Sequence, residues 1–308
     1  MSGFFANNIY RLSKPFLEAR ALRQRSMEHN LNNRLNNIEN LLHGGRATYL
    51  GNNRVLVKVV TGGRNFAYIV EANDLLISPW FIITGSYEIP LTNYFLRNIE
   101  HDSHCLDLGA NFGFFACLFA RLAPGGRVLA VEADEHVYGL CRDNLMINGL
   151  QHVGTAIHAA VNDDGRDLTL HRRIGRSGNT SVIAADLALT DWHGEPPAQP
   201  FNVAGLRIDD LLPRLNGRVD FIKIDVEGSE PPAFRGARQA IATNPQLRII
   251  MEWSPGQIHT AGEEPRNFLE DLETQGLRFY DIESEVSLST DEVLNITYVA
   301  GLLITRKP

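Results

Sequence analysis

The sequence predicts an α/β fold built on a parallel sheet with helices on both faces. From residue 104 onward, short apolar segments typical of strands alternate with segments whose apolar residues recur at helical spacing. With 308 residues, of which 44% are apolar, the chain can bury a sizeable core. Strands are expected near 104–108, 127–132, 154–160, 167–171, 219–225, 247–253, 277–282 and 297–304, and helices near 113–122, 136–147, 230–243 and 265–275.

The segment 1–45 differs in composition from the rest of the chain, with six asparagines between residues 30 and 40. Four apolar residues follow a 4-3-4 spacing: Leu31, Leu35, Ile38 and Leu42. This spacing places them on one stripe of a helix. The helix either packs on its own domain or forms a short coiled coil that makes the protein a homo-oligomer.

Between this segment and the α/β region, the sequence predicts a β-hairpin extension over residues 46–80. Val55–Val60 and Phe66–Val70 are rich in β-branched and aromatic residues, and the turn Thr61–Asn65 between them contains two glycines. A linker with two prolines follows, and a helix is expected from about 91 to 99. The main domain is then residues 81–308.

Composition excludes several classes of protein. The chain has 29 Lys+Arg against 36 Asp+Glu, a net charge of −7, which argues against non-specific nucleic-acid binding. Its three cysteines form no Cys-x-x-Cys pair, which is typical of a reducing compartment. The sequence shows neither a secretory leader nor a stretch of about 20 apolar residues. We therefore expect a soluble cytoplasmic protein.

The clearest motif follows the first expected strand, where Asp107–Gly113 reads Asp-Leu-Gly-Ala-Asn-Phe-Gly and leads into a helix. Small residues here let a nucleotide-like ligand approach the backbone, and the helix N-terminus offers free N–H groups. A dinucleotide fingerprint would require glycine at 111 and 114, where the chain has Asn111 and Phe114. A nicotinamide oxidoreductase is therefore disfavoured.

The next two strands end in polar residues that suit a nucleoside. Glu132 lies 19 residues after Gly113, at a position where an acid can accept hydrogen bonds from both ribose hydroxyls. Asn162 and Asp163 follow the third strand and could reach an adenine edge. An Asx-type turn is the alternative for this pair.

The fourth and fifth strands bring several ionisable groups to the same edge of the sheet. Lys223, Asp225 and Glu227 share one side if strand geometry persists that far, and Glu252 closes the next strand. Burying such groups costs free energy unless they are paired or bind a ligand. They therefore indicate either a functional cleft or a structural salt bridge.

Taken together, these segments resemble the class I S-adenosylmethionine-dependent methyltransferases, and more narrowly the FkbM methyltransferase family. The resemblance covers roughly residues 80 to 255. It rests on these segments: Asp107–Gly113, Tyr87-Glu88, Asn144–Gly149, Ile222–Glu230 and Arg235–Ala237.

The resemblance implies a Rossmann-like sheet of seven mostly parallel strands with an antiparallel C-terminal strand. It also implies S-adenosylmethionine as cofactor, S-adenosylhomocysteine as product, and transfer of a methyl group to a hydroxyl of a sugar, glycan or secondary metabolite. Residues 81–308 would form the methyltransferase domain. The alternative is a non-catalytic module that binds the cofactor and assembles with a partner through the N-terminal helix.

The resemblance also implies roles for particular residues. The methionine portion of the cofactor would be surrounded by Asp107, Gly109, Asn111 and Gly113, with Glu88 at its amino-acid end, Glu132 at the ribose, and Asn162 or Asp163 at the adenine.

The acceptor hydroxyl needs a base, or a metal that lowers its pKa. Asp225 and Glu227 are the first candidates to orient or deprotonate it, and Glu252 and His259 are the second. Hard cations need several oxygen ligands, and Trp253 stands where another would be expected. A divalent metal is therefore not favoured.

Overall fold

The computed structural model describes residues 45–178, 180–182 and 197–306. The predicted N-terminal helix and its coiled coil lie outside these residues. Within them, no helix has the length and apolar character needed to cross a membrane.

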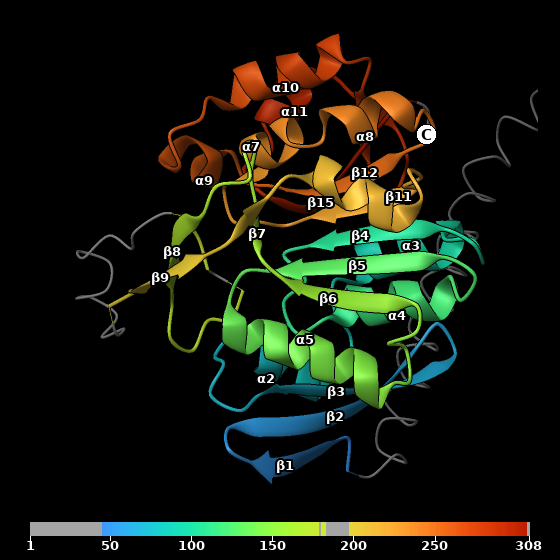
Figure 1. The fold of residues 1–308 in the computed structure, drawn as a ribbon, viewed down its shortest axis with the longest axis vertical. Helices are drawn as coiled ribbons and strands as arrows, with labels where there is room; N and C mark the ends of the chain where they lie inside the picture. The colour runs from blue at the N-terminus through green and yellow to red at the C-terminus, as the bar shows by residue number, and fades with distance from the viewer. Residues whose placement is uncertain (1–44, 179, 183–196, 307–308) are drawn as a thin grey trace, which may run out of the picture. The chain divides into compact units, whose positions relative to one another are not determined.

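The centre of the fold is one large mixed sheet (Figure 1) with the strand order β14-β13-β15-β12-β11-β4-β5-β6. The strands β6, β5, β4, β11 and β12 run parallel, and β15 is antiparallel to both of its neighbours. This confirms the predicted Rossmann-like sheet and its antiparallel last strand, with the two-residue β14 added at the edge. The bounds are β4 His104–Leu108, β5 Arg127–Glu132, β6 Gly154–His158, β11 Phe221–Ile224, β12 Arg248–Trp253, β13 Arg278–Asp281, β14 Ser287–Leu288 and β15 Val299–Thr305.

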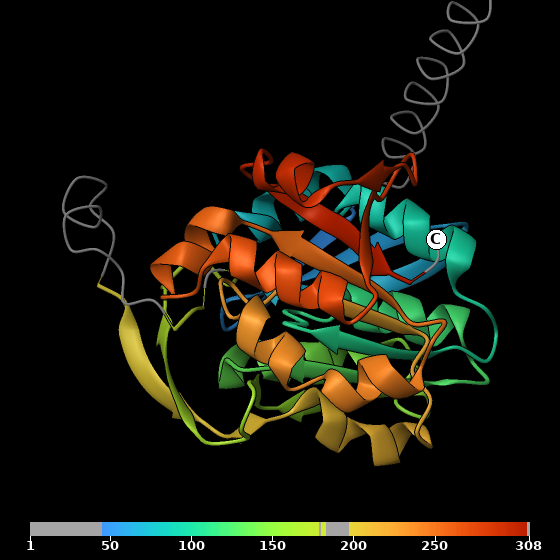
Figure 2. The same ribbon diagram turned by 90° about the horizontal axis from the view of Figure 1, so that it is seen from above.

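Helices cover both faces of the sheet (Figure 2), because successive strand residues point to opposite sides. Cys105 of β4 belongs to the core beneath α3, α4 and α5, whereas Leu106 belongs to the core beneath α7, α8 and α10. The bounds are α2 Ile77–Thr84, α3 Ile89–Asn98, α4 Phe114–Leu122, α5 Glu135–Ile147, the 3-10 helix η1 Ile208–Leu215, α7 Glu230–Arg235, α8 Arg238–Thr243, α9 Pro255–Thr260, α10 Pro265–Thr274 and α11 Thr290–Leu294.

The predicted hairpin is confirmed and extended to a three-stranded antiparallel sheet of β1 (Ala47–Gly51), β2 (Arg54–Thr61) and β3 (Arg64–Glu71). Its β3 edge is bound by Asn144 of α5 and by Asn148, the residue that caps this helix. The Asn144 side chain accepts from Ile69 N (2.6 Å) and donates to Ile69 O (2.9 Å). Asn148 does the same at Ala67, over 3.0 and 2.6 Å. These side chains satisfy edge groups that a further strand would otherwise pair.

Asn144 also connects the hairpin to the Asp107–Gly113 loop, because its side-chain amide donates to Phe112 O over 2.7 Å. Asn144 is fully buried, so this link lies inside the core. The antiparallel sheet therefore supports the loop that follows β4.

Two stretches differ from the sequence prediction. The expected linker contains α2, whose first turn accommodates Pro79 because that position needs no intrahelical N–H bond. The Asp74 carboxylate accepts from the backbone N–H groups of Ile77 and Ser78, at 2.8 and 2.6 Å, and so caps this helix. The strand expected at 167–171 forms, but outside the large sheet. Three short strands accompany it there: β8 (Leu168–Arg172) pairs with β9 (Gln199–Val203), and β7 (Ala160–Val161) pairs with β10 (Gly205–Leu206).

Candidate functional site

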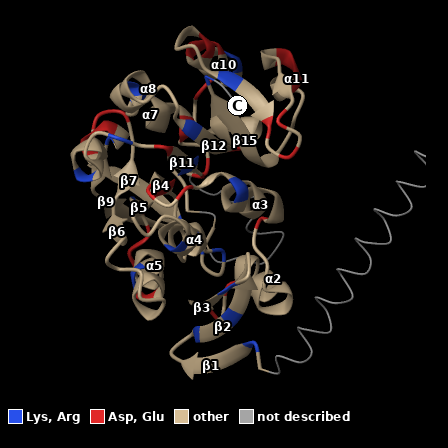
Figure 3. Cartoon of the chain, turned by 90° about the vertical axis from the view of Figure 1, so that its right-hand side faces the viewer, with Lys and Arg blue, Asp and Glu red and all other residues tan. Residues whose placement is uncertain are grey.

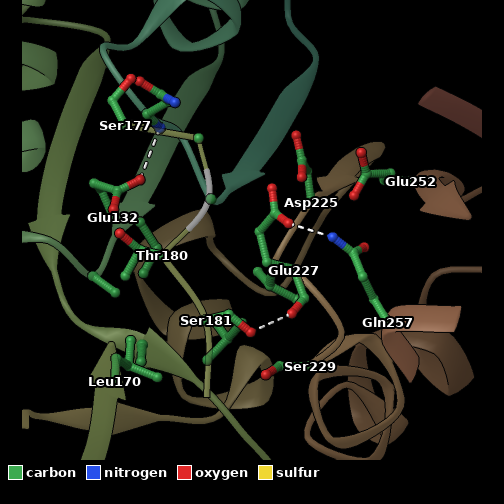
Figure 4. A pocket seen from close by; sticks show the side chains of 18 of the residues that line it. Glu132, Leu170, Ser177, Thr180, Ser181, Asp225, Glu227, Ser229, Glu252 and Gln257 are labelled. Carbon is green, nitrogen blue, oxygen red and sulfur yellow. Dashed lines mark hydrogen bonds between the residues drawn. The ribbon is translucent and has the colours of Figure 1, made fainter. Parts of the chain in front are cut away.

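A cavity of about 490 Å³ lies at the carboxyl ends of β4, β5, β11 and β12 (Figure 4), the edge where ligands bind in open α/β sheets. It brings together most of the residues that the sequence predicted for the site. Those that line it are Glu88, Gly109, Asn111, Glu132, Asp225, Glu227 and Glu252.

The loop after β4 approaches the neighbouring strand end too closely for a side chain at its first glycine. Gly109 has φ +73°, and a Cβ there would lie 1.7 Å from Asp225 O. Asn111 also has a positive φ, of 49°. Gly113 does not line the cavity, and a Cβ on it would lie 2.8 Å from Cys141 Sγ. Gly113 therefore lets α4 pack against α5, while Gly109 and Asn111 shape the floor of the cavity.

Glu132 fixes this loop from the end of β5. One of its carboxylate oxygens accepts from Asn111 N over 2.8 Å, and the other accepts from Asp134 N over 2.9 Å. Burial raises the pKa of Glu132 to about 7, although these backbone N–H donors oppose the shift. The carboxylate therefore faces the cavity with both oxygens already oriented.

Two charged residues lie beneath the loop. Asp107 is fully buried and does not line the cavity; burial raises its pKa to about 6, against the influence of Lys223. Burial alone would lower the pKa of the Lys223 ammonium, but Asp225, Asp107 and Glu88 raise it. Lys223 Nζ lies 3.0 Å from Asp225 Oδ2. The salt bridge that the sequence offered as one alternative therefore exists, between Lys223 and Asp225.

Three carboxylates meet across the cavity from Glu132. One carboxylate oxygen from each of Asp225, Glu227 and Glu252 lies within 4.8 Å of the others. Burial and the neighbouring acids raise the pKa of Glu227 to about 8 and that of Glu252 to about 9. The close approach of like charges in a partly buried site favours the neutral acids until a ligand brings positive charge.

The sequence predicts Glu227 on the same side as Lys223 and Asp225 only if the strand continues that far. The strand does not continue to Glu227. β11 ends at Ile224, and the backbone turns into the left-handed region at Glu227, with φ 53°. Two contacts hold this turn: the Ser181 hydroxyl donates to Glu227 O over 2.7 Å, and the Gln257 amide donates to Glu227 Oε2 over 2.6 Å. Figure 4 shows both bonds and the side chain of Glu227 directed toward Gln257.

Two further groups complete this side of the cavity. Glu88 precedes α3, and burial raises its pKa to about 7, whereas Lys223 lowers it. The Tyr298 hydroxyl is hydrogen-bonded to Glu252, and burial, followed by the charge of Glu252, raises the pKa of that tyrosine. Neither Tyr298 nor Gln257 belongs to a motif, so only their place in the fold reveals them.

Besides Asp107 and Gly113, three further predicted residues lie away from the cavity lining. Asn162 forms an Asx-type turn in which its side chain accepts from Gly165 N and donates to Arg166 O, both over 2.8 Å. Asp163 pairs with Arg235 at 3.0 Å, and His259 is exposed on α9. The wall near Glu132 is instead apolar, formed by Val131, Ala133, Ala160, Val161, Leu168 and Leu170.

The oxygen atoms that face the cavity suit a nucleoside that carries positive charge. Buried oxygens of Glu88, Glu252 and Gln257 have no hydrogen-bond partner within the described structure. The sulfonium and ammonium groups of S-adenosylmethionine would supply positive charge beside them. The three clustered carboxylates have the geometry to hold a divalent cation, but Lys223 already occupies one oxygen of Asp225, and Gln257 one of Glu227.

Comparison with known proteins agrees with this geometry. The family model of the methyltransferase FkbM domain matches residues 107–277, more than half of the chain. The chain belongs to the FkbM methyltransferase family. It is accordingly a methyltransferase that uses S-adenosylmethionine, as the motifs predicted.

Individual relatives are distant. Methyltransferase sdnD of Sordaria araneosa is 22% identical over 186 residues, which cover 54% of this chain and 72% of that protein. A TehB-like SAM-dependent methyltransferase from Corynebacterium glutamicum has a TM-score of 0.41 at 12% identity, with 75% of this chain and 95% of that chain covered. The O-methyltransferase from Bacillus cereus, in complex with SAH, has a TM-score of 0.38 at 17% identity, with 71% and 80% covered.

Proposed function

We propose that this FkbM methyltransferase transfers its methyl group to a hydroxyl oxygen of a small-molecule acceptor, such as a sugar or a secondary metabolite. The observation that carries the proposal is the carboxylate cluster of Asp225, Glu227 and Glu252, which lines the same cavity as the glycine loop. An alcohol oxygen must lose its proton during methyl transfer, and a cluster of high-pKa carboxyls is suited to receive it.

The cofactor would lie along the edge formed by β4 and β5. Gly109 and Asn111 would contact its methionine portion, Glu88 its amino group, and Glu132 its ribose hydroxyls. The apolar wall at Val161 and Leu168 would cover the adenine face. When bound, the cofactor supplies an electrophilic methyl group on a positively charged sulfur.

Glu227 is the base in this proposal. Gln257 holds one of its oxygens at 2.6 Å, which leaves the other to accept the proton of the acceptor hydroxyl. Its pKa of about 8 is close to the pH at which a general base works efficiently. Asp225, fixed by Lys223, would orient the acceptor, and Glu252 would hold the Tyr298 hydroxyl beside it. His259 is less suited than these acids, because it does not line the cavity.

This mechanism does not use a metal ion. A divalent cation at the three carboxylates would stand beside the Lys223 ammonium, which lies 3.0 Å from Asp225. It would also compete with the amide of Gln257 for Glu227. A carboxylate base can take the proton of the acceptor hydroxyl without this repulsion between positive charges.

We place the reaction in the cytoplasm, with a soluble acceptor other than nucleic acid. The three cysteines are free and buried, and the net charge of −7 opposes contact with a phosphate backbone.

The proposal is tested in two steps. Calorimetric titration with S-adenosylhomocysteine should show micromolar binding, about −8 kcal/mol, with NADH as the control that gives no signal. The protein is then supplied with labelled methyl donor and a panel of hydroxylated sugars and phenols. Labelled methyl ethers are expected. Cofactor binding without transfer to any hydroxyl would contradict O-methylation and favour the non-catalytic module.

A further inference from the structure

The helix α2 is apolar on both its inner and its outer face. No charged residue occurs between Asp74 and Glu88, and Figure 3 shows the helix without either charge colour. Its inner face is anchored in the core by Phe81, which is fully buried and packs against the rings of Tyr68 and Phe112. Surface helices normally present polar residues to water, so the outer face of α2 requires a separate explanation.

The outer face exposes large side chains next to the cavity. Trp80 of α2 is 62% exposed, and Leu75 and Leu76, which directly precede the helix, are 68% and 47% exposed. Leu76 and Trp80 also line the cavity, together with Ile77 between them. The apolar surface of α2 is therefore continuous with the site, because a ligand in the cavity that contacts Leu76 and Trp80 can extend onto the outer face of the helix.

We propose that the acceptor is amphipathic: its hydroxyl reaches the carboxylate cluster while an alkyl or aryl portion lies against Leu76, Trp80 and the outer face of α2. This proposal rests on the proposed function and narrows its acceptor class. The cluster of Asp225, Glu227 and Glu252 serves the polar end, and the uncharged helix serves the apolar end. Removing the exposed apolar area of both partners from water supplies the binding free energy.

An exposed apolar helix could also bind a membrane surface, but the charge of this protein argues against that. Helices that lie on membranes combine an apolar face with lysines and arginines. The stretch from Asp74 to Glu88 contains no lysine or arginine, and the whole chain carries −7. A small amphipathic molecule does not require that positive charge.

The test uses the full-length protein saturated with S-adenosylhomocysteine and a homologous series of methyl, butyl and hexyl β-glucosides. Each added methylene should tighten binding by roughly two- to fourfold, the range that partial to full burial of a methylene allows. Trp80→Gln and Leu76→Gln should flatten this dependence on chain length. Tyr49→Gln is the matched control, because Tyr49 is equally exposed, at 66%, but lies on β1.

The outcomes separate the two proposals. Loss of S-adenosylhomocysteine binding in the parent protein would contradict the proposed function itself. Intact cofactor binding with no chain-length dependence, or with one that survives Trp80→Gln, would overturn the apolar subsite alone. Sedimentation with neutral phosphatidylcholine vesicles that Trp80→Gln abolishes would assign the face to a membrane, and a change of mass in solution would assign it to a second copy; either result overturns the proposal.

Discussion

The two sides of the cavity hold acids of opposite character. Glu132 accepts two backbone N–H groups, so the chain itself fixes both of its oxygens. Glu227 is held at one oxygen by a single side-chain amide, that of Gln257, and it lies close to the carboxylates of Asp225 and Glu252. Both pKa values are raised, to about 7 and about 8. In the proposed mechanism, Glu132 therefore recognises the ligand, whereas Glu227 takes up a proton.

Substitution of Glu227, the proposed base, should have the largest effect on the rate of methyl transfer. Glu227→Gln should lower kcat by roughly 10²- to 10⁴-fold, because it removes the base but keeps the shape of the side chain. In the parent enzyme the rate should rise as pH approaches about 8, where Glu227 loses its proton, and this rise should vanish in the variant. Glu270→Gln, at an exposed position on α10, is the control. An unchanged kcat would remove Glu227 from the mechanism.

A smaller effect, on cofactor binding and not on the rate, is expected at Glu132. Glu132→Gln should weaken S-adenosylhomocysteine binding by roughly 10- to 100-fold, because an amide cannot accept from two backbone N–H groups as well as from the ribose. The pH dependence of kcat should stay as in the parent. Calorimetry and pH profiles measure the two quantities, with the exposed Glu135→Gln as the matched variant. If Glu132→Gln instead changed the pH profile, the distinction between the two sides would be lost.

The carboxylate cluster should also weaken the fold at high pH. Burial and the charges of Asp225 and Glu227 raise the pKa of Glu252 from 4.5 to about 9, so the native state holds a proton that the unfolded chain releases. Stability therefore falls as pH rises from about 4.5 to 9. Glu252→Gln should remove this loss and gain roughly 1–3 kcal/mol at pH 9, but little at pH 5. Urea unfolding at the two pH values measures it.

The control for this measurement is Glu264→Gln, which changes an exposed acid before α10. It should leave the pH dependence of stability unaltered. Equal behaviour of the two variants would show that the raised pKa of Glu252 does not affect the stability of the fold.

The smallest expected effect comes from removing metal ions. Prolonged dialysis against a chelator should change kcat by less than about twofold, because Lys223 and Gln257 already bind the oxygens that a cation would need. Activity is measured before dialysis, after it, and after adding back Mg²⁺. Loss on dialysis with recovery on addition would make the acid cluster a metal site and overturn the carboxylate-base mechanism.

Much of the nucleotide side could be predicted from local sequence. The loop from Asp107 to Gly113 and the acid at the end of β5 are encoded within 26 residues, and their chemistry follows from glycine geometry and the strand ends. Asn162 and Asp163 show the limit of such reasoning. They follow a strand as expected, but the structure engages their side chains in a turn and in an ion pair with Arg235.

Periodicity and short motifs are local properties, so the fold class, the family and the positions of the acids at strand ends could be predicted from the chain alone. Which of these groups meet depends on how the elements pack. Gln257 reaches Glu227 because α9 follows β12, which lies beside β11, and Trp80 faces the cavity because Phe81 anchors α2. Such contacts join residues far apart in the chain, and their geometry depends on packing, which no local pattern specifies.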